Sequence, residues 1–197
     1  VTLASDTLST VAVTGTAGAR LSANLVGAST TVTGTVTSAG GADDITYNAT
    51  GTDKISVDMG AGDDTVRLST APGLATGSTT AGSQTVVGGD GTDTLVTGVA
   101  VTKATGSAIS GFETLRVTNG SSVVLDSSTN DISKLIADGT GASVTGVEAG
   151  ATVDLTTAGS VTLDKTTTGA ITVNVGNTSL SGTQTSLVTA AGVTSAT

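Results

Sequence analysis

The chain has 197 residues and a formal net charge of −9, and it contains no cysteine and no histidine. This composition excludes disulfide cross-links, thiol catalysis and histidine-based acid–base chemistry. We expect no nucleic-acid partner, because phosphate binding needs clustered lysine and arginine, and the seven basic residues are scattered. We also expect no membrane insertion, since no apolar run approaches the length of a membrane span.

The fold class is predicted from the kinds of apolar residues that the chain contains. With one phenylalanine, one tyrosine and no tryptophan, a core must be built from aliphatic side chains and threonine methyl groups. A thin β-solenoid meets this condition because each coil buries only a few side chains. Disorder is the competing interpretation of a chain rich in Thr, Gly and Ser, but regular aliphatic triplets argue against it. We predict that 1–197 form one all-β domain, a right-handed parallel β-solenoid.

Short strands are expected from the N-terminus onward, because apolar and polar residues alternate there. The first such segments lie at 11–13, 25–26 and 32–36. Helical spacing is found only weakly, near 129–137, where a strand fits better. Turn residues separate the apolar segments, so each strand is expected to end after a few residues.

Glycine–aspartate turns follow the first strands. GADDI at 41–45 and GTDKI at 51–55 share the pattern Gly-x-Asp-x-aliphatic. GAGDDTV at 60–66 and GGDGTDTL at 88–95 fit the longer pattern G-G-x-G-x-D-x-U-x, with U a large aliphatic residue, which binds calcium in RTX proteins. Glycine lets the backbone turn its carbonyl groups toward a cation, and aspartate adds a charged oxygen ligand of the kind that Ca²⁺ selects.

We therefore predict that coils within 38–96 bind Ca²⁺ between neighbouring turns. In a roll with two repeats per coil, every second repeat stacks on the same edge, which places Asp43, Asp64 and Asp93 together and Asp53 opposite. The alternative is ordinary Asp-Gly turns without metal, and Lys54 would repel a cation beside Asp53. The predicted metal-site residues are Gly41, Asp43, Asp44, Gly51, Asp53, Gly60, Gly62, Asp63, Asp64, Gly88, Gly89, Asp90, Gly91 and Asp93.

The segment 111–197 is predicted to continue the solenoid with calcium-poor coils. It repeats the aliphatic triplets, but its aspartates lack flanking Gly-x-Gly turns. We interpret Asp126, Asp154 and Asp164 as exposed charges at strand ends.

Phe112 and Glu113 begin this calcium-poor segment. We expect Phe112 to fill the interior of a coil, because one buried aromatic ring covers much area in a core of small residues. Glu113 is then expected to pair with Arg116 or to face solvent. The alternative for Glu113 is a contact with calcium or with a neighbouring molecule in a lattice.

The order of three elements carries a family resemblance. GAGDDTV at 60–66, GGDGTDTL at 88–95 and GFETLRV at 111–117 resemble RTX-type surface-layer (S-layer) proteins of Gram-negative bacteria, in particular the lattice domains of those from Caulobacter. GGADDI at 40–45 is similar to a turn just upstream in that family. The resemblance implies an RTX-type β-roll stapled by Ca²⁺, secretion by a type I route, calcium-dependent folding outside the cell and assembly into a two-dimensional lattice.

The leading functional hypothesis is a structural protein of the cell surface, extracellular and calcium-dependent, that forms an S-layer lattice or a related array. Its expected partners are further copies of itself, in a homo-oligomeric lattice or filament, with cell-surface polysaccharide as a second candidate. The alternative is an RTX adhesin segment, or a calcium-binding roll attached to a secreted protein. The missing initiator methionine indicates a fragment of a longer chain.

We do not expect an enzyme. Glycoside hydrolysis needs two carboxylates that flank one sugar site. Adjacent residues on a strand point to opposite faces, so neither Asp43 with Asp44 nor Asp63 with Asp64 meets this need. Sugar sites are also usually lined with aromatic residues, of which the chain has one Phe and one Tyr.

Overall fold

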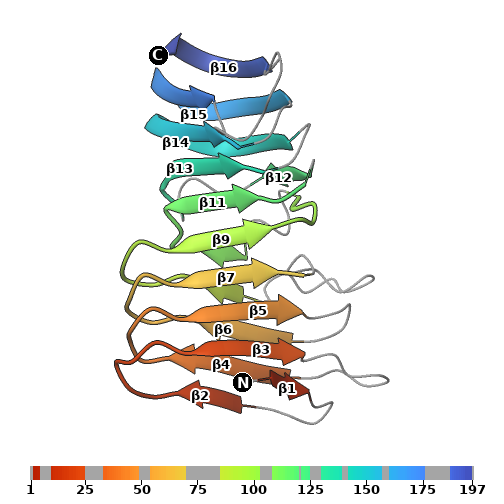
Figure 1. Ribbon diagram of the computed structural model, residues 1–197, viewed down its shortest axis with the longest axis vertical. Helices are drawn as coiled ribbons and strands as arrows, with labels where there is room; N and C mark the ends of the chain where they lie inside the picture. Colours follow the sequence, from red (N-terminus) through yellow and green to blue (C-terminus); the bar gives the residue numbers. More distant parts are fainter. Residues whose placement is uncertain are drawn as a thin grey trace.

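The computed structural model describes residues 2–4, 10–24, 33–48, 54–69, 85–102, 108–119, 121–124, 130–138, 142–156, 160–175 and 187–196. Over these residues the chain is an all-β solenoid, in which parallel strands stack along one axis (Figure 1). This confirms the predicted fold class. The described part of the chain contains no helix that is long and apolar enough to cross a membrane.

The strands of the described part are short up to β13 and long after it. In chain order they are β1 (Thr2–Ala4), β2 (Thr10–Val13), β3 (Arg20–Asn24), β4 (Thr33–Ser38), β5 (Asp44–Asn48), β6 (Lys54–Asp58), β7 (Thr65–Leu68), β8 (Thr85–Val87), β9 (Thr94–Thr97), β10 (Ile109–Ser110), β11 (Thr114–Val117), β12 (Ser122–Val124), β13 (Ile132–Ala137), β14 (Ala142–Leu155), β15 (Ser160–Val175) and β16 (Leu187–Ala196).

Two parallel sheets divide these strands between them. The larger sheet has the order β1-β3-β5-β7-β9-β11-β13-β14-β15-β16, and the smaller sheet has the order β10-β8-β6-β4-β2. From β2 to β11 the chain therefore alternates, giving one strand to the smaller sheet and the next to the larger. This is the predicted coil of two strands. It places residues of consecutive coils side by side.

From β12 onward the coils are built differently. β12 pairs with the first residues of β14, and β13 pairs with its later residues. One long strand therefore takes the place of the two short strands that form each earlier coil. β15 and β16 repeat this arrangement, with register shifts near the middle of each strand. The aliphatic triplets predicted short separate strands here. The structure instead continues one strand across the corner. In β14 the register shifts between Val147 and Thr152, and Gly150 between them has a φ of +84°.

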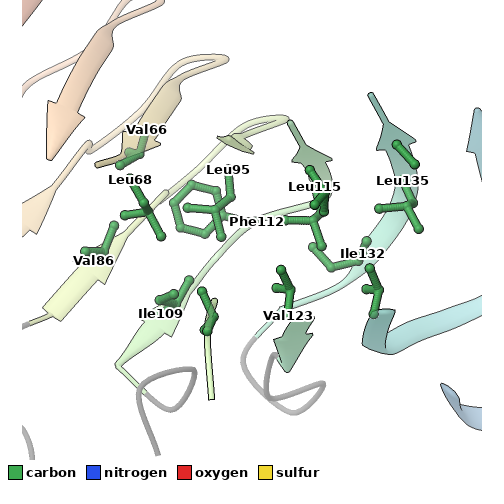
Figure 2. Close-up of a cluster of buried hydrophobic side chains, with 14 of the residues drawn as sticks. Val66, Leu68, Val86, Leu95, Ile109, Phe112, Leu115, Val123, Ile132 and Leu135 are labelled. Carbon is green, nitrogen blue, oxygen red and sulfur yellow. The ribbon is translucent and has the colours of Figure 1, made fainter. Parts of the chain in front are cut away.

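The core is a stack of aliphatic side chains that repeats from coil to coil (Figure 2). Alternation along each strand points every second side chain inward, and fully burying one such side chain stabilises the fold by about 1.5–3 kcal/mol. One row of the larger sheet, in register and at most 2% exposed, consists of Ile45, Val66, Leu95, Leu115, Leu135 and Val153.

Phe112 is fully buried and belongs to this core. Figure 2 shows its ring among the aliphatic side chains that include Leu95 and Leu115. The predicted position inside a coil is therefore confirmed. The segment 71–84, which the sequence predicts to be a loop bulging from one enlarged coil, lies outside the described residues.

Candidate metal site on the turn edge

The glycine–aspartate turns stack on one edge of the solenoid, where each connects a strand of the smaller sheet to the next strand of the larger one. Backbone hydrogen bonds join consecutive turns: the amide of Thr94 donates to Asp64 O over 2.7 Å, and that of Thr114 to Asp93 O over 2.9 Å. Asp43, Asp64 and Asp93 thus lie above one another, as predicted. The stacked turns are 39–43, 59–64, 88–93 and 111–113.

The carboxylates of these turns form a continuous ladder. Asp64 Oδ1 accepts the backbone N–H of Asp43 over 2.7 Å, and Asp93 Oδ1 accepts that of Asp64 over 2.8 Å. Asp43 Oδ1 accepts the N–H of Ala19 in the same way. Glu113 continues the series, because its Oε2 atom accepts the N–H of Asp93 over 2.7 Å. Each carboxylate thus binds the turn of the coil before it.

The second carboxylate oxygen is satisfied in one turn and not in the next two. Asp43 Oδ2 accepts a hydrogen bond from the hydroxyl of Ser38. Asp64 Oδ2 and Asp93 Oδ2 are buried, and they accept no hydrogen bond from the described residues. The two side chains are 1% and 0% exposed. A buried oxygen without a partner is unfavourable, more so when it is charged.

The electrostatics of Asp64 and Asp93 reflect this environment. Burial, reinforced by the charges of Asp64, Glu113 and Asp63, raises the pKa of Asp93 to about 6, against the lowering effect of the hydrogen bond from the Asp64 amide. The pKa of Asp64 is also raised, first by burial and then by the charges of Asp43 and Asp63. Both carboxyl groups would be stabilised in the charged form by a nearby cation.

The glycines of the pattern let the turns approach closely. A Cβ atom on Gly62 would lie 2.2 Å from Gly41 O, and one on Gly91 would lie 2.0 Å from Gly62 O. Both residues also have positive φ, +138° for Gly62 and +144° for Gly91. Gly41, Gly60, Gly88 and Gly89 lie in the same stacked turns.

Asp63 and Asp90 lie on the exposed side of these turns. Asp63 Oδ1 accepts the N–H of Thr92 over 2.9 Å. The backbone of Asp90 pairs with the turn before it: its N–H donates to Gly60 O, and its carbonyl accepts from Gly62, each over 2.8 Å. Both residues were predicted at the metal site, and the structure places them beside the ladder with their side chains toward solvent.

Asp44 differs from the other predicted metal residues because two arginines bind its carboxylate. Arg67 Nε lies 2.9 Å from Asp44 Oδ1, and Arg20 Nη2 lies 3.0 Å from Oδ2. Burial acts to raise the pKa of Asp44, but the hydrogen bonds and charges of Arg67 and Arg20 outweigh it and hold that pKa below its usual value. A cation is not needed here, so we leave Asp44 out of the candidate site. Gly51 and Asp53 lie outside the described residues.

Glu113 is the residue of the ladder that the sequence prediction placed elsewhere. Instead of pairing with Arg116, its carboxylate accepts the Asp93 amide, and Arg116 pairs with Asp138. A signal for this was present, since Glu-Thr-Leu at 113–115 matches Asp-Thr-Leu at 93–95.

The donor set of this edge fits a hard cation such as Ca²⁺. Ca²⁺ takes six to eight oxygen ligands from carboxylates, carbonyl groups and water, and the edge offers two buried unpartnered carboxylate oxygens among stacked carbonyl groups. The described residues contain no group of three or more Asp, Glu, His or Cys side chains placed to hold a metal ion. Backbone carbonyl groups or water would therefore have to supply most of the ligands.

Comparisons with known proteins leave this site to be interpreted from its own geometry. No family model matches the chain, and neither a curated protein nor a solved structure shows a significant similarity to it.

Proposed function

We propose that the protein is a structural cell-surface protein, a calcium-dependent subunit of an S-layer lattice or of a related extracellular array. The observation that carries this proposal is the pair of buried oxygens Asp64 Oδ2 and Asp93 Oδ2, which accept no hydrogen bond from the described residues. A bound cation would supply the positively charged partner that no described basic side chain provides for these carboxylates. The proposal assigns no catalytic activity to the chain.

Calcium is the cation that this donor set favours. Carboxylate and carbonyl oxygens are hard ligands, and Ca²⁺ accepts them in flexible arrangements, whereas Mg²⁺ demands near-octahedral geometry and loses its water reluctantly. Extracellular modules bind Ca²⁺ at about 10⁻⁴–10⁻³ M. Binding energy becomes folding energy when a site forms only in the folded state, so such a chain folds after it leaves the cell. This supports secretion, for which we propose a type I route.

Self-assembly is supported by the net charge of −9, because divalent cations can bridge acidic surfaces of neighbouring copies. Weak contacts that repeat across an array become effective together, which is how we propose that copies of the chain build a lattice or filament.

The proposal is tested by following folding and assembly in a calcium series. We expect circular dichroism to show β-structure reduced in EGTA and restored with millimolar Ca²⁺, with Mg²⁺ a poor substitute. Negative-stain images of the same samples should show monomers or small oligomers in EGTA, and sheets, rings or filaments with Ca²⁺.

Two results would count against this function. A circular dichroism spectrum unchanged by EGTA, after bound metal is shown to be removed, would contradict the calcium dependence. Monodisperse monomers at every calcium level, together with specific binding to a glycan or a host protein, would replace the lattice function with that of an adhesin segment.

A further inference from the structure

We propose that the turn edge has one cation-requiring segment, which runs from Asp64 through Asp93 to Glu113, and that the hydroxyl of Ser38 takes the cation's place at Asp43. This inference rests on the proposed calcium dependence. It adds a ligand, Glu113, that the nonapeptide pattern does not contain, and it removes Asp43 from the ligands that the pattern predicts.

The first boundary of the segment is set by the residue five positions before each aspartate. Pairing of β4 with β6 and of β6 with β8 brings Ser38, Met59 and Gly88 into one column on consecutive coils. Ser38 donates its hydroxyl to Asp43 Oδ2. Met59 and Gly88 have no polar side chain, and in their coils the corresponding oxygens of Asp64 and Asp93 have no partner.

The second boundary is set by Glu113. Its turn, 111–113, is shorter than the two before it, and the longer glutamate side chain still reaches the Asp93 amide. In the next coil the residue aligned with Glu113 is Ser133, whose backbone N–H donates to Glu113 O over 3.0 Å. The series of carboxylates therefore ends at Glu113.

The charge of the segment is not balanced by basic side chains of the described residues. None of the ion pairs found there involves Asp64, Asp93 or Glu113. These pairs are Arg20 and Arg67 with Asp44, Arg116 with Asp138, and Lys134 with Asp154.

The segment thus offers two carboxylates at each step, first Asp64 with Asp93 and then Asp93 with Glu113. This agrees with the absence, among the described residues, of any cluster of three acidic side chains around one point. Each step leaves the remaining ligands of a Ca²⁺ ion to turn carbonyl groups and water.

The decisive variant is Glu113→Gln, measured by calorimetric titration with CaCl₂. Glutamine keeps an oxygen that can accept the Asp93 amide but removes the charge, so we expect calcium binding to weaken about tenfold or more. The matched control is Asp58→Asn, because Asp58 is exposed and its Oδ1 accepts the Gly60 amide over 3.1 Å. This control should bind calcium like the parent protein.

A second pair of variants tests the first boundary without touching an acidic residue. Ser38→Ala removes the hydrogen-bond donor to Asp43 Oδ2, so the turn 39–43 should then also require a cation. We expect the difference between the melting temperatures with and without Ca²⁺ to increase relative to the parent. Ser69→Ala, at an exposed serine, should leave this difference unchanged.

The outcomes separate this inference from the proposed function. If the parent protein does not bind Ca²⁺, both fail. If the parent binds Ca²⁺ and Glu113→Gln binds it equally well, the assignment of Glu113 is wrong while the proposed function stands. If Glu113→Gln does not fold even with millimolar Ca²⁺, Ser38→Ala decides, and an unchanged calcium-dependent shift in that variant overturns the proposal.

Discussion

At the scale of single residues, Asp43 and Asp93 show how one neighbour changes the chemistry of the same position. Both carboxylates accept the amide of the preceding turn through Oδ1. The second oxygen of Asp43 accepts a hydrogen bond from the hydroxyl of Ser38, whereas that of Asp93 accepts none from the described residues. Identical motif positions therefore need not bind the same ion.

Replacing Asp93 by Asn is expected to have opposite effects with and without calcium. Asn retains the oxygen that accepts the Asp64 amide and removes a buried charge, so the metal-free protein should melt at a higher temperature than the parent. Calcium binding should weaken about tenfold or more, because a charged ligand is lost. Calorimetric titration and thermal melts in EGTA measure the two effects.

Asp154→Asn is the control for this substitution. Asp154 Oδ2 lies 3.5 Å from Lys134 Nζ, and Oδ1 accepts from Asn174 Nδ2 over 2.7 Å on the outer face. Calcium binding should be unaffected. Equal losses of binding in the two variants would mean that the site does not lie on the turn edge.

The metal-free protein is expected to become more stable as the pH falls from 7 to 5. The pKa of Asp93, 3.8 in an ordinary aspartate, is raised to about 6 in the folded protein, mainly by burial. The folded state then binds a proton that the unfolded state still releases, so protonation favours folding. This contribution is complete below 3.8 and is lost as the pH rises through 6.

Urea unfolding in EGTA between pH 5 and 7 measures this dependence. Asp93→Asn serves as the comparison and should show a flatter profile over the same range. A parent profile that is flat, or that rises with pH, would show that Asp93 does not carry an unfavourable charge.

At the scale of the element, the turns require glycine for close stacking as well as for backbone conformation. Gly62 and Gly15 both have positive φ, but a Cβ atom would meet the backbone of the neighbouring turn only at Gly62. At Gly15 no atom of the described residues lies within 4 Å of such an atom. Substitutions at the two glycines therefore distinguish the effect of backbone strain from the effect of close contact between coils.

Gly62→Ala should destabilise the protein by about 1–3 kcal/mol more than Gly15→Ala, because only the first substitution also forces neighbouring backbone apart. Chemical denaturation with Ca²⁺ present measures both free energies of unfolding. Similar losses in the two variants would indicate that the turns adjust to an added methyl group without separating.

At the scale of the whole molecule, the solenoid has two parts that differ in how their coils are closed. The coils from β4 to β11 are closed by the stacked turns with their carboxylate ladder. The coils that contain β14 and β15 have long strands with register shifts near the middle of each strand. In a solenoid each coil contacts mainly its neighbours, so the proposed calcium ions would act chiefly on the first part.

Removal of calcium is therefore expected to loosen the two parts unequally. Hydrogen exchange followed by mass spectrometry should show faster exchange in EGTA for β5, β7 and β9, with a smaller change for β14 and β15. The physical reason is that local opening follows local stability. Uniform acceleration over all these strands would show that the solenoid unfolds as one cooperative unit.

Much of this architecture was determined by the sequence itself. Period-two spacing of aliphatic residues and the scarcity of aromatic side chains predicted a thin parallel solenoid. The glycine–aspartate pattern predicted that Asp43, Asp64 and Asp93 share one edge, and a single aromatic residue in a small-residue core predicted the burial of Phe112. These features depend on local chemistry and on the fixed periodicity of a strand.

Only the tertiary structure decided the partners of each carboxylate. The contacts of Asp44 with Arg20 and Arg67 and of Glu113 with the Asp93 amide join residues that are 20 to 24 positions apart. Such contacts depend on the register between coils, which turn lengths and register shifts set and which periodicity does not specify. For the same reason the hydroxyl of Ser38, on the strand before its turn, became part of the edge only when the coil closed around Asp43.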